Sequence, residues 1–250
     1  MKIPVGCMQC LTKNMEMTSY PIIDNINEQD YYEVKCEHGH TNYYYFQNEK
    51  FDILFTLAIQ ALCDGYNREA YLNFVASLER FYEFGVRLMT KINGTTPEDY
   101  ATLNKQLNSN SERELGAYCS LFLATKKEPA KILTNSQRNY RNRVVHQGVS
   151  PSRVKTVELG ESVYNLIRND FLFFNENYPN VVNELCFDRQ RQLREKTKKP
   201  LWNAVIFSYI DSSSFLSIDD MIKQHSDMNK IIHDTQKALQ FNNKDTKSVY

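Results

Sequence analysis

Residues 67–92, NREAYLNFVASLERFYEFGVRLMTKI, place apolar side chains at the 3.6-residue period of an amphipathic helix. The pattern stops at Asn93-Gly94, with Pro97 just beyond, which is typical of a helix end. A long amphipathic helix of this kind indicates a mainly α fold. Its apolar stripe consists of Tyr71, Phe74, Val75, Leu78, Phe81, Tyr82, Gly85, Leu88 and Met89.

The same period recurs on both sides of this stretch. Ser111, with Glu114 three residues later, has the capping-box pattern of a helix start, and Gly148 with Pro151 marks a helix end. We expect further helices at 50–64, 112–126, 130–147, 151–176, 180–197 and 218–238, an apolar segment at 201–210, and a frayed tail. In the helix at 151–176 the predicted inward-facing residues are Val154, Val157, Leu159, Val163, Leu166, Ile167 and Phe171.

Residues 1–48 differ in character from this helical part. Two β-rich stretches, 31–35 and 41–46, flank a turn at Gly39 and predict a hairpin. Cys7-x2-Cys10 and Cys36-x3-His40 have the knuckle spacing of a structural zinc site, because zinc prefers four such ligands in a tetrahedron. His38 is an alternative to His40; we favour His40 because Gly39 allows the tight turn. A closed set of four ligands leaves no open position for catalysis at the metal.

Composition excludes several classes of protein. Lysine plus arginine and aspartate plus glutamate both number 30, so any basic surface for a nucleic acid must be local. The N-terminus lacks the apolar core of a signal peptide, and the best apolar run, 51–63, is interrupted and too short to span a bilayer. We therefore expect a cytoplasmic protein without membrane contact, in which the six cysteines form no disulfides.

A short run, Arg141-Asn142-Arg143-Val144-Val145-His146, carries the groups that chemistry on a phosphodiester needs. Arginine holds phosphate oxygens with a fork of donors, and histidine accepts or gives a proton near neutral pH. On an ideal helix Asn142 and His146 share one face, whereas Arg141 and His146 point about 140° apart, at about 100° per residue. A site made by this helix alone therefore requires the long Arg141 side chain to wrap round.

With Tyr140 before the run and Gly148 after it, the pattern resembles the catalytic motif of HEPN-domain ribonucleases. The resemblance covers about residues 50–176 and includes an earlier core helix containing residues 66–83. It implies a HEPN-like helical bundle, and the small β-hairpin zinc ribbon expected from the Cys/His spacing would precede this bundle. Arg141 would bind the scissile phosphate, Asn142 would orient it and His146 would transfer protons, with Glu79, Arg138 and Tyr140 in supporting positions.

Glu79 lies at the edge of the apolar stripe, where a carboxylate needs a cation; Arg141 and Arg138 are both candidates. The family is known for dimers with a composite cleft and for cleavage without a metal. A homodimer suits the chemistry as well, because one histidine cannot easily act as base and acid at once. A subgroup of the family carries a modified tyrosine two residues after the histidine; Gly148 stands there, which argues against that regulation.

The sequence thus predicts a zinc-ribbon-like domain at 1–48, a HEPN-like bundle at 50–176, and a C-terminal helical extension at 177–250 on the bundle or the dimer interface. The predicted function is metal-independent endoribonuclease activity on RNA, which the resemblance links to toxins and abortive-infection (anti-phage) effectors with an antitoxin or phage trigger. The alternative is a non-catalytic adaptor that binds RNA or protein, with Arg141 and His146 structural. The basic stretch at 188–199 is either an RNA contact or a solvated helix face.

Overall fold

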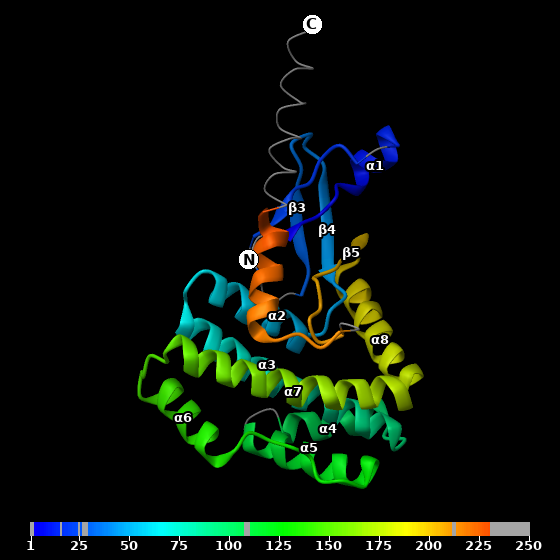
Figure 1. The fold of residues 1–250 in the computed structure, drawn as a ribbon. Coiled ribbons are helices and arrows are strands. Elements are labelled where there is room, and N and C mark those ends of the chain that lie inside the picture. The colour runs from blue at the N-terminus through cyan, green and yellow to red at the C-terminus, as the bar shows by residue number, and fades with distance from the viewer. Residues whose placement is uncertain are drawn as a thin grey trace, which may run out of the picture. The chain divides into compact units, whose positions relative to one another are not determined.

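The computed structural model describes residues 3–15, 17–24, 26, 30–107, 111–211 and 214–230. These residues form two compact units, each described by itself (Figure 1). The N-terminal unit contains the residues up to 47 together with 192–206 and the described residues from 219 onward. The helical unit contains residues 48–191 and 207–218. The mainly α class predicted from the sequence is confirmed.

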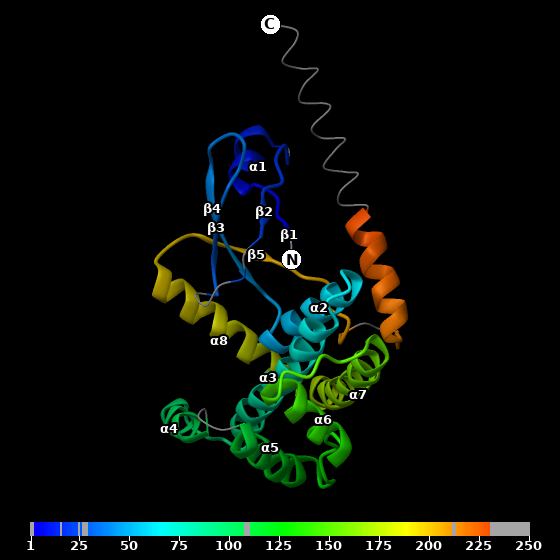
Figure 2. The same cartoon turned by 90° about the vertical axis from the view of Figure 1, so that its left-hand side faces the viewer.

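The helical unit is built around one long central helix, α3 (Asn67–Ile92), which has the predicted bounds. Helix α3 packs against α2 (Lys50–Cys63), α5 (Ser111–Lys126) and α7 (Arg153–Asn177). The short helices α4 (Pro97–Leu107) and α6 (Asn135–His146) complete the unit, and α8 (Pro179–Thr197) begins in it. In both views α5 and α6 lie on the same side of α3 and α7 (Figures 1 and 2).

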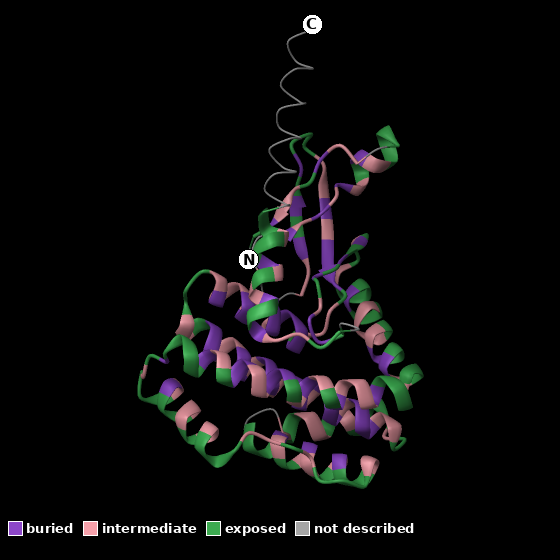
Figure 3. Cartoon of the chain, viewed as in Figure 1, coloured by how far each residue is buried: buried purple, intermediate pink, exposed green. Residues whose placement is uncertain are grey.

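The core of the helical unit is aromatic. Buried positions recur along α3 and α7 (Figure 3), and Phe74, Phe81 and Met89 of the predicted stripe are at most 1% exposed. Gly85 is required for this packing, because a Cβ there would lie 2.4 Å from the ring of Tyr118 on α5. The ring of Tyr118 therefore lies directly against the α3 backbone and brings α5 close to it.

The starts of α6 and α5 differ from the prediction. Helix α6 begins at Asn135 rather than 130, because Thr134 and Gln137 form a capping box: the Gln137 N–H donates to Thr134 Oγ1, and the Thr134 N–H donates to Gln137 Oε1. Helix α5 begins at Ser111 itself, the residue expected to cap it.

Helix α7 departs from its predicted inward face at its first turn. Leu159, Val163 and Ile167 are buried as predicted, but Val154 is 66% exposed. Ser152 caps the helix, so Val154 lies in a first turn that extends beyond the core. The apolar period therefore predicted the middle of α7 correctly and its start incorrectly.

The N-terminal unit contains a short helix and two small sheets. Strands β3 (Tyr32–Lys35) and β4 (Thr41–Phe46) form the predicted antiparallel hairpin. Strand β5 (Leu201–Ala204), predicted only as an apolar segment, adds to β4 in parallel, so the sheet order is β3-β4-β5. Strands β1 (Ile3–Pro4) and β2 (Ile22–Ile23) form a separate antiparallel pair, with helix α1 (Met8–Asn14) between them in sequence.

The segment expected as a C-terminal helical extension, 177–250, contains both helix and strand. After α8 the chain forms β5 and then a further helix that begins at residue 218 and continues to 230, the last described residue. The rest of the helix expected at 218–238, and the expected tail, lie outside the described residues. Among the described helices, none combines the length and apolarity that crossing a membrane requires.

Candidate functional site

The predicted Cys/His cluster is assembled by two tight turns of the N-terminal unit. Cys7 caps α1, with its Sγ accepting a hydrogen bond from the Cys10 N–H at 3.5 Å, so both thiols lie at the start of this helix. Cys36 and His40 flank the turn between β3 and β4. In this turn the Gly39 N–H donates to the Cys36 carbonyl at 2.9 Å and Gly39 has a φ of 79°, a conformation that favours glycine.

The four candidate ligand atoms lie at separations that suit one metal ion. They are all within 4.8 Å of one another, and the three cysteines are buried. Ligand distances near 2.3 Å to sulfur and 2.0–2.1 Å to nitrogen put neighbouring donors of a tetrahedron roughly 3.5–3.8 Å apart. The structure has 3.9 Å from Cys10 Sγ to Cys36 Sγ, and 3.4 Å and 3.8 Å from His40 Nδ1 to Cys10 Sγ and Cys7 Sγ. This cluster could hold a structural metal such as zinc.

Polar contacts around the cluster favour a thiolate at Cys7. Burial alone would raise the pKa of Cys7, but hydrogen bonds from Cys10, Asn42 and His40 lower it to about 6; the Asn42 amide donates to Cys7 Sγ at 3.1 Å. The pKa of Cys10 is raised to about 11 by burial and by the neighbouring thiols. His38 Nδ1 also lies 3.3 Å from Cys10 Sγ, but His38 is outside the group of four mutually close ligands.

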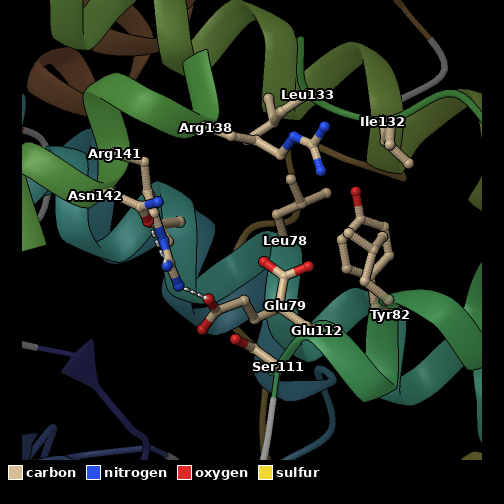
Figure 4. A pocket seen from close by; sticks show the side chains of 12 residues that line it. Leu78, Glu79, Tyr82, Ser111, Glu112, Ile132, Leu133, Arg138, Arg141 and Asn142 are labelled. Atoms are coloured by element: carbon tan, nitrogen blue, oxygen red, sulfur yellow. Dashed lines mark hydrogen bonds and ion pairs between the residues drawn. The ribbon is translucent and has the colours of Figure 1, made fainter. Parts of the chain in front are cut away.

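In the helical unit, α6 carries Arg141, Asn142 and His146. Arg141 Nη2 forms an ion pair with Glu79 Oε1 on α3, and Arg141 Nη1 donates to Asn142 Oδ1 at 3.0 Å (Figure 4). The side chains of Arg141 and Glu79 are 22% and 28% exposed. Glu79 therefore pairs with Arg141, one of its two candidate cations, and this pair fixes the direction of the guanidinium.

Arg141 and Glu79 line a small pocket of about 70 Å³ between α3, α5, α6 and the segment before α6. Figure 4 shows Arg138 and Arg141 on one wall, with Glu79 and Glu112 opposite them. Among the other lining residues, Asn142 was predicted as a site residue, and Val75, Leu78 and Tyr82 were predicted only as part of the apolar stripe. The sequence indicated no functional role for the remaining lining residues, which are Ser111, Leu115, Ile132 and Leu133.

The other predicted residues of α6 are arranged as follows. Arg138 Nη2 donates to Asn135 Oδ1 within the helix. The Tyr140 ring packs edge-on against Tyr71 of α3, with centroids 5.9 Å apart, and the Arg143 guanidinium lies 5.7 Å from the Tyr140 centroid. Tyr140 therefore helps to dock α6 on α3 and is not part of the pocket lining.

His146 is the last residue of α6, and its position differs from that of the other motif residues. Its side chain is exposed, is not among the residues lining the pocket, and has no hydrogen-bond or ion-pair partner among the described residues. The structure thus brings Arg138, Arg141, Asn142 and Glu79 together and leaves His146 in solvent. The wide angle between Arg141 and His146 on the helix accounts for this separation.

Part of the basic stretch at 188–199 makes contacts within its own unit. Arg189 Nη1 donates to the Asn48 carbonyl at 2.7 Å, and Arg191 pairs with Asp188 at 3.3 Å. In the N-terminal unit the Lys199 ammonium lies 4.0 Å from the centroid of the Tyr43 ring. Much of this charge therefore has partners in the fold.

Comparison of the chain with protein-family profiles, curated proteins and solved structures finds no match. The structure shows a Cys3His cluster near the N-terminus, followed by a mainly helical body.

Proposed function

We propose that this protein is a metal-independent endoribonuclease of HEPN type. The observation that carries the proposal is the placement of two side chains of α6. Arg141 is held at a pocket by Glu79 of α3, while His146 on the same helix is exposed and available for proton transfer. An arginine with five donors retains free N–H groups for a phosphate after bonding Glu79 and Asn142. The HEPN assignment itself rests on the resemblance of the run 141–146.

The proposed reaction is transesterification by the RNA itself. The 2′-oxygen attacks the adjacent phosphorus, its proton passes to one histidine, and a second histidine protonates the departing 5′-oxygen as the P–O5′ bond breaks. The products are a 2′,3′-cyclic phosphate and a free 5′-hydroxyl. Arg141 would stabilise the charge that develops on the phosphoryl oxygens.

This reaction needs two histidines, and α6 supplies one. A homodimer with a two-fold axis near the end of α6 would bring two copies of His146 to one cleft. The exposure of His146 at the helix end is compatible with such an arrangement. RNA would then bind across both copies of the pocket that contains Arg141.

One observation favours the alternative of a non-catalytic adaptor. The charge of Arg141 is already balanced by Glu79, and His146 is outside the pocket in the single chain. In that case the Arg141–Glu79 pair would simply join α6 to α3, and the protein would bind RNA or another protein without cleaving it.

For the N-terminal unit we propose a zinc ribbon in which Cys7, Cys10, Cys36 and His40 hold a structural zinc ion. A small unit with little core gains much of its folding free energy from such a metal. The zinc would have no part in cleavage. A biological role as a toxin or abortive-infection effector, with an antitoxin or a phage component as trigger, rests on the HEPN resemblance alone.

The deciding experiment incubates purified protein with total RNA in the presence of a chelator and maps the ends of the products. Wild-type protein should give 2′,3′-cyclic phosphate ends and leave DNA intact. His146→Ala and Arg141→Ala should each lower the rate by ~100-fold or more, and Asn142→Ala by less.

The matched control is Arg143→Ala, which removes an arginine from the same helix that is outside the pocket. It should retain activity. A wild-type protein inert on all RNA would favour the adaptor, and activity that survives both His146→Ala and Arg141→Ala would place the site elsewhere.

A further inference from the structure

A second, larger pocket of about 520 Å³ lies beside the one that contains Arg141. Its lining comes from α7 on one side and from the start of α6 and the segment before it on the other. Ile132 lines both pockets, so the two are neighbours in the helical unit. A volume of this size is in the range of small-molecule sites.

Three of the polar side chains that line this pocket already have partners within the helical unit. Gln137 Nε2 donates to Ser162 Oγ at 2.7 Å, and the Ser162 hydroxyl donates to the Glu158 carbonyl at 2.9 Å. The Asn165 amide donates to the Glu161 carbonyl at 2.8 Å. The first of these bonds joins α6 to α7, and the other two lie within α7.

Three groups remain for a ligand. Asp170 is only 8% exposed, and its Oδ2 accepts a hydrogen bond from the Tyr118 hydroxyl at 2.7 Å, while its Oδ1 has no partner among the described residues. The Asn169 amide and the Lys131 ammonium are exposed, and neither makes a hydrogen bond or ion pair within the described chain. The pocket therefore offers the Asp170 carboxylate as an acceptor, the Lys131 ammonium as a donor, and the Asn169 carboxamide as either.

The apolar lining consists of Leu166 on α7 and Ile132 on the facing segment. Both are half-buried, so they present apolar surface to the pocket from opposite sides. A flat ring system suits such a space. The two apolar faces of the ring can contact Leu166 and Ile132, while the groups on the edge of the ring form hydrogen bonds.

We propose that this pocket binds a guanine base. The edge of guanine presents two adjacent N–H donors, N1–H and N2–H, beside the acceptor O6. A carboxylate has about four acceptor positions on its two oxygens, so Asp170 can accept the donor pair on Oδ1 and on the remaining lone pair of Oδ2 while Oδ2 still bonds Tyr118. Asn169 or Lys131 can donate to O6. Adenine, cytosine and uracil do not present two adjacent donors on this edge.

This inference rests on the proposed function, in which it gives the RNA cleavage site a preference for guanosine next to the scissile phosphate. Gln137 and Arg141 are four residues apart, one turn of α6, and the first lines this pocket while the second lines its neighbour. A base held in the larger pocket would leave its phosphate near Arg141.

The test measures binding of guanosine, adenosine, cytidine and uridine 5′-monophosphates to the full-length protein by calorimetry, without turnover. The guanosine nucleotide should bind about 10-fold or more tightly than the other three. Asp170→Asn keeps an acceptor for Tyr118 but turns an amide N–H toward the base, so it should remove this preference.

Asn169→Ala provides a variant at an exposed position that should fold normally and weaken guanosine nucleotide binding several-fold. Its matched control is Asn177→Ala, at the end of the same helix and outside the pocket, which should bind like wild type. Equal binding of all four nucleotides, or guanosine binding unchanged in both pocket variants, would overturn the proposal.

The failure of this proposal and that of the nuclease proposal are distinguishable. Selective guanosine binding by a protein that cleaves no RNA would support the pocket and reject the nuclease. RNA cleavage with no preference at guanosine, together with no nucleotide binding, would reject the pocket and support the nuclease.

Discussion

The ion pair between Glu79 and Arg141 gives a direct test of whether the direction of Arg141 matters. Replacing Glu79 with alanine leaves Arg141 without its carboxylate partner. With side chains 28% and 22% exposed, the pair lies between exposed pairs, worth ~0.2–1 kcal/mol, and buried pairs, whose breakage costs ~3–5 kcal/mol. We expect Glu79→Ala to lower the free energy of unfolding by about 1–2 kcal/mol.

The same free energy sets the expected effect on RNA cleavage. If the pair holds Arg141 in its working position, a loss of about 1–2 kcal/mol of transition-state stabilisation lowers the rate about 5- to 30-fold. Glu79→Gln, which keeps an acceptor oxygen without the charge, should fall between wild type and Glu79→Ala. Urea unfolding and initial cleavage rates on one defined RNA measure both effects.

Glu83→Ala is a matched control on the same helix. Glu83 pairs with Arg80 at 2.5 Å, with side chains 31% and 33% exposed, and it is not among the residues lining the pocket. Its replacement should cost less stability than Glu79→Ala, because Arg80 keeps Glu114 as a second partner at 3.7 Å, and it should leave cleavage unchanged. A Glu79→Ala variant that is destabilised but cleaves at the wild-type rate would refute the positioning role of this carboxylate.

Three further outcomes are expected. If the proposed zinc site is correct, elemental analysis should find zinc in the wild type and in Cys119→Ser but not in Cys36→Ser. Cys36→Ser should also destabilise the N-terminal unit while keeping most of the helical circular dichroism, and metal-free wild-type protein would contradict the site. Asp52 has a pKa raised by burial from 3.8 to about 6; because the folded state holds this proton more tightly than the unfolded chain, stability should fall as the pH rises from about 4 to about 6. Asp52→Asn removes the titrating group and should weaken this dependence, as urea unfolding at pH 4.5 and 7.5 will show. Light scattering at micromolar concentration should return twice the chain mass, and a monomer would count against a composite cleft.

The sequence predicted most helices of the helical unit because they have clear apolar periods and clear ends. Helix α4 was not predicted, because it buries no residue and so has no apolar stripe. The bounds of α3 follow from an uninterrupted stripe that stops at Asn93-Gly94. Helix α6 was predicted five residues too long at its start, because its capping residue Thr134 lies in a polar stretch without an apolar period. Strand β5 was missed, because pairing with a distant strand leaves no local signal in a run of four residues.

The candidate sites also differ in how far the sequence could predict them. The Cys/His cluster was predictable, because a metal imposes local spacing on its ligands. The partnership of Arg141 with Glu79 was anticipated only as one of two choices, since it depends on how α6 packs on α3. The pocket around Asp170 had no sequence signal at all, because its lining comes from α7 and from a non-helical segment.

The parallel pairing of β5 with β4 has a consequence for the newly made chain. The ribosome releases the whole stretch 48–191 of the helical unit before it reaches Leu201, the first residue of β5. Synthesis adds about 5–20 residues per second, so the edge of β4 that later pairs with β5 stays unpaired for on the order of ten seconds. That edge includes the aromatic run Tyr43–Phe46, and an open edge of this kind readily recruits strands from other chains. Chaperone demand during synthesis should therefore peak in this interval and fall once β5 has emerged.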